Sequence, residues 1–174
     1  DKHWSRGLGD VYKRQVRRGM GVVLENFSLS VSQGECVLLH GDNGIGKSTI
    51  IETAARLLPL ESGTVRHHGV VVCDGEGRRT KPINYFGLTL QRNCLVPSQT
   101  VQQRLDNIAA LCNKSLDMTD IIESYKIGNR RNDRIANLSG GQQRKVAVIS
   151  GLLPGMISEK TRLILLDEPD SGPV

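Results

Sequence analysis

The stretch GDNGIGKST, Gly41 to Thr49, decides the fold of this chain. It follows a short apolar run that ends in glycine, GECVLLHG (34–41), and it leads into KSTIIETAARLL (47–58), whose apolar residues have helical spacing. In the pattern Gly-x4-Gly-Lys-Ser, the glycines let successive backbone N–H groups point inward and hold a phosphate. The sequence therefore predicts a phosphate-binding loop between a strand buried on both faces and a helix.

The residues of this loop have predicted roles in holding a triphosphate. Lys47 supplies a positive charge between the β- and γ-phosphates, and the Ser48 hydroxyl is a ligand for Mg²⁺. We expect nine consecutive residues to form the nucleotide site: Gly41, Asp42, Asn43, Gly44, Ile45, Gly46, Lys47, Ser48 and Thr49.

Outside the loop, strand-like and helix-like segments alternate. Apolar patterns predict strands at 22–31, 85–91 and 163–166, and a hairpin at 62–77. Helical spacing predicts helices at 100–112, 118–127 and 140–153. This order predicts an α/β fold with a parallel sheet, a small antiparallel β subdomain and an inserted helical subdomain at about residues 100–150.

Three side chains at predicted strand ends are candidates for hydrolytic chemistry. Asp167 ends the apolar run LILLD, and a carboxylate at that end of a parallel strand is expected beside the phosphate loop, where it can bind Mg²⁺. Glu168 follows and is expected to point to the other face, where it can orient and polarise a water molecule. Gln91 closes the strand at 85–91, and its amide can reach Mg²⁺ or that water.

The stretch LSGGQ, Leu138 to Gln142, opens a predicted helix with two glycines that weaken its first turn. The backbone N–H groups of such a helix start are donors for an anion. Because the loop at 41–49 already holds the phosphates of its own nucleotide, we expect this stretch to contact ATP held by a second copy of the domain. The contacting residues are predicted to be Ser139, Gly140, Gly141 and Gln142.

Taken together, these motifs resemble the ATP-binding cassette (ABC) family, the nucleotide-binding domains of ABC transporters. The resemblance covers about Val22 to Gly172 and includes, in the family's order, GDNGIGKST, Gln91, LSGGQQRKVA (138–147) and LILLDEP (163–169). It implies a P-loop NTPase core and Mg²⁺-dependent hydrolysis of ATP to ADP and phosphate. It also implies two kinds of partner, a second nucleotide-binding domain and transmembrane permease subunits. Those subunits would hold the chain on the cytoplasmic face of the membrane, where Gln91 would couple their motion to hydrolysis.

Parts of the family pattern are missing. The aromatic residue that stacks on adenine is expected just before residue 22, where Arg18 could stack instead. The chain stops at Val174, before the family's Asp-bearing loop and the histidine that contacts the γ-phosphate. We therefore interpret the chain as truncated at its C-terminus, and we expect it to bind ATP better than it hydrolyses it.

The N-terminal segment also departs from the family. SRGLGDVYKRQ (5–15) matches one reading frame of a widely used transposase sequencing adapter, so we interpret residues 1–15 as non-native and 16–174 as a partial nucleotide-binding domain. Without residues 1–15 the net charge falls from +5 to +3. That weak basicity, together with only 3% aromatic residues for base stacking, predicts no nucleic-acid partner.

The apolar pattern and the cysteine spacing both favour a cytoplasmic chain that reaches the membrane only through partners. The longest apolar stretch, 146–157, contains two glycines and a proline and is too short to cross a bilayer, so membrane association is expected through partner subunits. The four cysteines have no CxxC spacing, which argues against a zinc site or disulfide framework and favours the cytoplasm.

Soluble ATPases of the same family are the open alternative. Those that maintain DNA usually carry a long coiled coil or zinc modules between the phosphate loop and the acidic strand end, whereas Lys47 and Asp167 are only 120 residues apart here. A translation factor with two cassettes, or the ATPase of an iron–sulfur assembly complex, is compatible with this chain. Neighbouring genes for membrane permeases would favour transport.

Overall fold

The computed structural model describes residues 9–18, 21–25, 27–80, 85–158 and 163–168 of the 174. For residues 9–25 it describes the backbone only. The chain divides into two compact units, Asp1–Asn84 and Tyr85–Val174. Each unit is considered by itself below.

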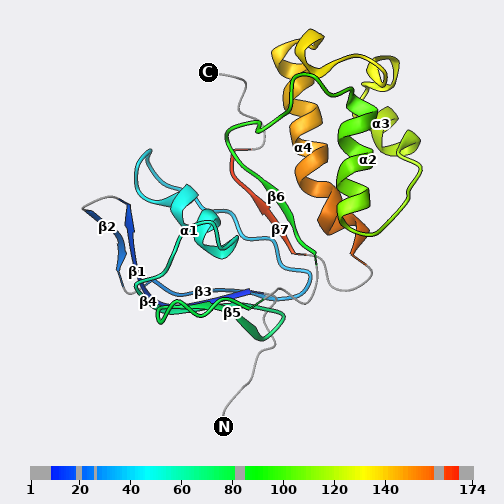
Figure 1. The fold of residues 1–174 in the computed structure, drawn as a ribbon. Helices are drawn as coiled ribbons and strands as arrows, with labels where there is room; N and C mark the ends of the chain where they lie inside the picture. The colour runs from blue at the N-terminus through cyan, green and yellow to red at the C-terminus, as the bar shows by residue number, and fades with distance from the viewer. Residues whose placement is uncertain (1–8, 19–20, 26, 81–84, 159–162, 169–174) are drawn as a thin grey trace. The chain divides into compact units, whose positions relative to one another are not determined.

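The first unit is built on an antiparallel sheet (Figure 1). Its strands are β1 (Gly9–Arg18), β2 (Gly21–Glu25), β3 (Leu29–Val31), β4 (Ser62–His67) and β5 (Val70–Asp74). Strand β1 pairs with β2, β3 and β4, and β4 pairs with β5. The hairpin predicted at 62–77 is therefore confirmed as β4 and β5, which pack Val65, Val72 and Cys73 with Leu60 into a small core.

The structure divides one predicted strand of this sheet, and it includes residues that we interpreted as non-native. Residues 9–15, which we set aside as non-native, contribute to β1 and pair with β3 and β4. The predicted strand at 22–31 is divided into β2 and β3. The adapter origin of residues 1–15 stays a prediction, which the DNA sequence of the parent gene tests.

The strand predicted before the phosphate loop is absent. Residues 36–40 form no strand, and the Leu38 side chain is 86% exposed. A strand needs a hydrogen-bonded neighbour on at least one side. Among the residues that the structure describes, β1 already pairs with β2, β3 and β4, and no ladder includes residues 36–40. The prediction of a strand buried on both faces is therefore wrong for this structure.

Helix α1 (Lys47–Ala54) follows the phosphate loop, as predicted, but it is shorter than the run 47–58. Arg56 has φ +65, in the left-handed region that ends helices. The buried Thr53 hydroxyl donates to Thr49 O at 2.5 Å. The helix thus ends before Leu58, the last residue of the predicted run.

The second unit combines two strands with helices (Figure 1). Its elements are β6 (Gly87–Thr89), α2 (Val101–Leu111), α3 (Thr119–Ser124), η1 (Gly128–Arg130), η2 (Ile135–Asn137), α4 (Gly140–Ile157) and β7 (Ile164–Leu166). Strands β6 and β7 are parallel, with Gly87 opposite Ile164 and Thr89 opposite Leu166. The predicted parallel pairing is therefore confirmed.

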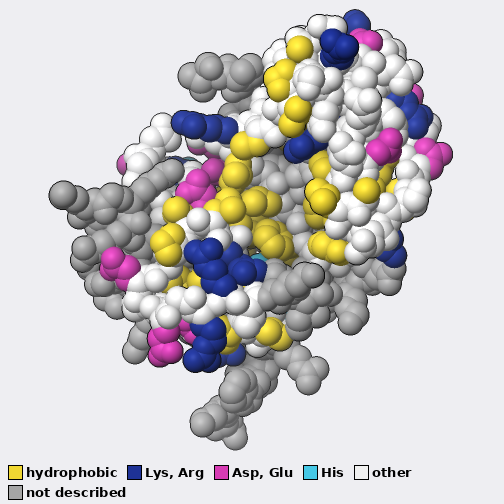
Figure 2. Space-filling view, in the orientation of Figure 1, with side chains coloured by type: hydrophobic (Ala, Val, Ile, Leu, Met, Phe, Trp, Pro, Cys, Tyr) yellow, Lys and Arg dark blue, Asp and Glu magenta, His cyan; other side chains and the backbone are white. Residues whose placement is uncertain are grey.

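A continuous apolar core holds the helices of this unit together. It consists of buried side chains from α2, α3, α4 and their connections, among them Val101, Leu105, Ile122, Val146 and Leu153. In the space-filling view, basic and acidic side chains are interspersed over the helical surface (Figure 2). No region of one charge sign dominates this helical part of the view, as is typical of a solvated surface.

The backbones of helix α4 and strand β6 lie very close together. A Cβ atom added to Gly151 would lie 2.1 Å from Leu88 O, and one added to Gly155 would lie 2.6 Å from Gly87 N. Only glycine fits at such distances, because any side chain would have to displace backbone atoms. This contact fixes α4 against the strand that leads to Gln91.

Candidate functional site

The phosphate loop of the first unit has the backbone that its glycines predict. Gly44 has φ +87 and Gly46 has φ +107, both in the left-handed region that disfavours side chains. Gly46 is the N-cap of α1, and its carbonyl accepts from Ile50 N at 3.0 Å. The loop therefore turns directly into the start of a helix, whose first N–H groups and dipole favour an anion.

Lys47 folds back over this loop. Its Nζ donates to Gly41 O at 2.6 Å and to Asp42 O at 2.8 Å. The ammonium is thus held at the opening of the loop, where it can attract a phosphate. Asp42, Asn43, Gly44 and Ile45 are exposed, whereas Thr49 is buried beneath the helix start. Residues 42–45 of the predicted loop are therefore accessible to a ligand.

The second unit brings together the residues predicted at its strand ends. Asp167 is 5% exposed, and its N–H donates to Thr89 O at 3.0 Å, which extends the β6–β7 ladder by one bond. Gln91 Nε2 donates to Glu168 Oε2 at 3.0 Å. Glu168 has φ +44, which is uncommon for a residue with a side chain. The predicted amide and carboxylate are thus neighbours, although 77 positions separate them in the sequence.

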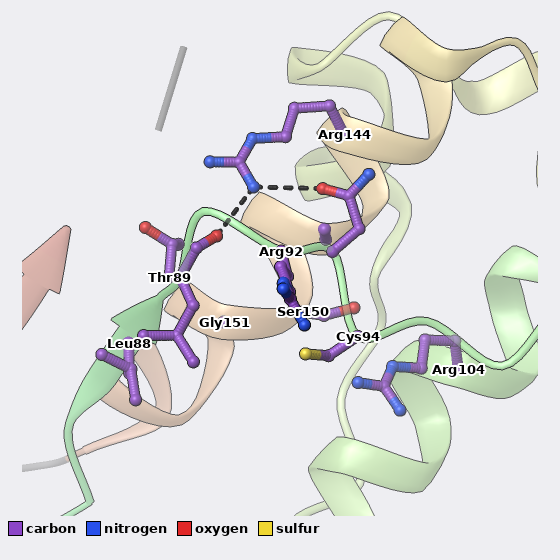
Figure 3. Close-up of a pocket in the computed structure, with 11 residues that line it drawn as sticks. Leu88, Thr89, Arg92, Cys94, Arg104, Arg144, Ser150 and Gly151 are labelled. Carbon is purple, nitrogen blue, oxygen red and sulfur yellow. Dashed lines mark hydrogen bonds between the residues drawn. The ribbon is translucent and has the colours of Figure 1, made fainter. Parts of the chain in front are cut away.

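Arg144, on α4, is a residue that the sequence analysis did not single out. It is only 6% exposed, and its guanidinium donates to Leu90 O, Gln91 O, Asn93 Oδ1 and Glu168 O. Figure 3 shows the two bonds to Leu90 and Asn93. Arg144 also borders a cavity of about 120 Å³ that Thr89 and Ser150 help to line. No sequence signal separates it from the adjacent Lys145, which is exposed.

The stretch LSGGQ forms a capped helix start. Ser139 is the N-cap of α4: its Oγ accepts from Gln142 N at 3.3 Å, and its N–H donates to Gln142 Oε1 at 2.9 Å. Gly140 and Gly141 form the first turn, and nothing lies within 4 Å of a Cβ added to Gly141. The first turn of α4 is therefore unobstructed at the Cβ position of Gly141.

The predicted site residues thus fall into two groups. The phosphate loop lies in the first unit, and Gln91, Asp167, Glu168 and the stretch 139–142 lie in the second. Over the ranges described, no group of three or more His, Cys, Asp or Glu side chains could hold a metal ion. Hydroxyl, carboxylate and amide oxygens, such as those of Ser48, Asp167 and Gln91, are ligand types that Mg²⁺ accepts, and it binds few protein ligands when phosphates complete its shell. The Lys47 ammonium at the loop opening suits a phosphate.

The fold and these motifs define a P-loop nucleoside triphosphatase. Residues 24–171 match the family described as ABC transporter. The chain is 31% identical over 170 residues to the glutamine transport ATP-binding protein GlnQ of Geobacillus stearothermophilus, covering 93% of this chain and 68% of that protein. It is also 31% identical over 168 residues to the lipoprotein-releasing system ATP-binding protein LolD of Anaplasma marginale, covering 92% and 72%.

A solved structure supports the same fold. A putative ABC transporter ATP-binding protein from Pyrococcus furiosus superposes with a TM-score of 0.74 at 22% identity, covering 92% of this chain and 75% of that one. This chain therefore belongs to the ABC transporter family, and the matched part is the family's ATPase domain. It spans about two thirds of the length of the first curated relatives. Within the described ranges, no helix has the length and apolar character needed to cross a membrane.

Proposed function

We propose that this chain binds Mg-ATP through residues 41–49 and hydrolyses it as the ATPase subunit of a transporter. The observation that carries the proposal is the loop itself, where Lys47 Nζ is held 2.6 Å from Gly41 O at the start of α1. A cation and a helix N-terminus at one place favour a phosphate group. The similarity to GlnQ and LolD, whose names describe transport ATP-binding proteins, supports the same function.

Each remaining site residue has a role in this proposal. Ser48, Asp167 and Gln91 would hold Mg²⁺, which when bound neutralises charge on the phosphates. Glu168 would accept a proton from the attacking water, and Gln91 would orient that water. The 3.0 Å contact between Gln91 Nε2 and Glu168 Oε2 supports this division of roles, since both side chains then reach the same water.

The proposal includes a second nucleotide-binding domain. Ser139, Gly140, Gly141 and Gln142 would contact ATP held by the phosphate loop of the other copy, so that two ATP molecules join two domains. The capped but unobstructed first turn of α4 supports this arrangement, because Gly141 leaves room for a ligand. The copies would separate after hydrolysis, when the contact to the γ-phosphate is lost.

Permease subunits are the second proposed partner. The similarity to subunits of a glutamine transport system and a lipoprotein-releasing system supports a chain that works with separate membrane components. We propose that the chain lies on the cytoplasmic face of the membrane through these subunits. Movement of the segment around Gln91 would then couple hydrolysis to transport.

Calorimetric titration with Mg-ATP tests the phosphate loop. In Lys47→Ala, affinity should fall by about 10²-fold or more, because a lost charge contact to phosphate costs a few kcal/mol. Lys145→Ala is the matched control, since this lysine is exposed on α4 and should leave affinity unchanged. If the unaltered chain gives no saturable heat, or if Lys47→Ala binds as tightly as the control, the proposal is wrong.

A further inference from the structure

Arg144 is a buried cation that donates hydrogen bonds to two separate segments of the second unit. Its Nη1 donates to Leu90 O at 2.8 Å, Gln91 O at 3.2 Å and Asn93 Oδ1 at 3.0 Å. Its Nη2 donates to Glu168 O at 2.5 Å. A buried guanidinium is costly unless oxygen acceptors surround it, and here two chain segments supply them.

These contacts lie just where the parallel ladder ends. The last backbone bond between the two strand ends joins Asp167 N to Thr89 O at 3.0 Å. Beyond this bond, the segment 90–93 and Glu168 have no ladder to keep them together in the part of the chain that the structure describes. The Arg144 guanidinium bridges them at this point. The side chains of Gln91 and Glu168 then meet at 3.0 Å.

The backbone of Glu168 gives a reason for such a bridge. A glutamate with φ +44 is held in a conformation that is uncommon for residues with a side chain, and such a conformation persists only when its surroundings fix it. Arg144 Nη2 holds the carbonyl of this same residue. The close contact of Gly151 and Gly155 with β6 fixes the helix that carries Arg144. The carboxylate of Glu168 is thereby supported by an element distant in the sequence.

We infer that Arg144 is a positioning residue for ATP hydrolysis, which sets Glu168 and Gln91 in one geometry through their backbone carbonyls. This inference rests on the proposed role of Glu168 as the base. A lysine would keep the positive charge but would lack the planar, forked guanidinium group. It would therefore not reach acceptors on both segments at once. Because Arg144 contacts the segments that carry Gln91 and Glu168, the inference concerns the rate of hydrolysis and not the affinity for ATP.

Steady-state ATPase kinetics of the full-length protein test the inference. Arg144→Lys and Arg144→Gln should lower kcat by about 10²-fold, as expected for a misplacement near 1 Å, while KM changes less than about threefold. Lys145→Gln, the neighbouring exposed cation on α4, should keep both constants. Binding stoichiometry of ATP, measured on each variant, corrects kcat for any inactive fraction, so a folding defect does not imitate the effect.

A double-mutant cycle separates positioning from general structure. When Glu168 is already glutamine, adding Arg144→Gln should not reduce the single-turnover rate further, since the base that Arg144 positions is gone. An equal loss in both backgrounds, or a wild-type kcat in Arg144→Lys, would overturn the inference. Absence of saturable hydrolysis in the unaltered protein would instead refute the proposed function, so the two failures are distinguishable.

Discussion

The phosphate loop and the strand-end site are assembled in different ways. In the loop, the contacts of Lys47 reach back only five and six residues, to Asp42 O and Gly41 O. At the strand ends, Gln91 contacts Glu168 across 77 positions, and Arg144 contacts Asn93 across 51. The loop is thus determined by nine consecutive residues, whereas the second site depends on how β6, α4 and β7 pack.

This difference predicts different responses to substitution. A change in the loop should affect ATP binding directly, because the phosphate contacts the altered residue. A change at the strand ends should affect hydrolysis while binding persists, since we propose that Gln91 and Glu168, which contact each other, act on the attacking water. Substitutions that alter the packing of α4 against β6 should affect hydrolysis indirectly, through the position of α4.

The largest effect is expected for Glu168→Gln. Loss of the general base should lower kcat of the full-length protein by about 10²- to 10⁴-fold, while ATP still binds. Because hydrolysis no longer separates the copies, an ATP-bound dimer should accumulate, and light scattering after size-exclusion chromatography would detect it. Glu76→Gln, an exposed acid in the first unit, is the control and should behave like the unaltered protein. A Glu168→Gln protein that stays monomeric with saturating ATP contradicts the two-copy site.

The second-largest effect is expected for Gly151→Ala, and it concerns stability. The new Cβ would lie 2.1 Å from Leu88 O, so α4 must move away from β6, at a cost of about 3 kcal/mol in unfolding free energy. Gly141→Ala, on the same helix, meets no atom within 4 Å and should gain up to about 1 kcal/mol of helix propensity. Urea unfolding followed by circular dichroism measures both. Equal stability of the two variants would show that the α4–β6 contact does not hold the second unit.

Much of the fold could be predicted from local patterns. Glycines at turns and apolar alternation identified β4 and β5, and the helical spacing identified α2, α3 and α4. The prediction of a buried strand at 34–41 failed because continuous apolar residues indicate burial only if neighbouring strands are present. The sequence does not say where those strands are. Strand β1 was missed because its residues show no alternating pattern, although β3 and β4 supply its hydrogen bonds.

The candidate site could likewise be predicted only where its geometry depends on consecutive residues. The phosphate loop could be located from its spacing alone, since its geometry depends on glycines and a helix start within nine residues. Gln91, Asp167 and Glu168 were predicted at strand ends, but their mutual contact follows only from the parallel register of β6 and β7. Arg144 could not be predicted, because its burial depends on carbonyls of two distant segments.

The smallest effect concerns pH and involves a histidine of the first unit, at the C-terminal end of α1. His67 ends β4, is 3% exposed, and its Nε2 lies 2.9 Å from Ala54 O at the end of α1. Since the carbonyl accepts, Nε2 carries a hydrogen. Burial lowers the pKa of His67 below its usual value; the Ala54 carbonyl opposes this shift, and nearby His68 and Arg56 add to it.

The direction of the pH dependence follows from this shift. Below about pH 6.5 the unfolded chain binds a proton at His67 that the folded chain resists, so stability should fall as pH falls toward the lowered folded pKa. The slope from this residue is at most about 1.4 kcal/mol per pH unit, and none of it remains above both pKa values. Urea midpoints between pH 7.5 and 5 measure it.

His67→Gln isolates the titration from the hydrogen bond, because the glutamine amide can still donate to Ala54 O. This variant should flatten the pH dependence, and His67→Gln with His68→Gln should flatten it further, since burial lowers the pKa of His68 as well. ATP affinity at pH 7.5 should stay unchanged in both variants. An unaltered slope in His67→Gln would mean that the contact between β4 and α1 does not exclude the charged imidazole, and that the packing behind the phosphate loop is open to water.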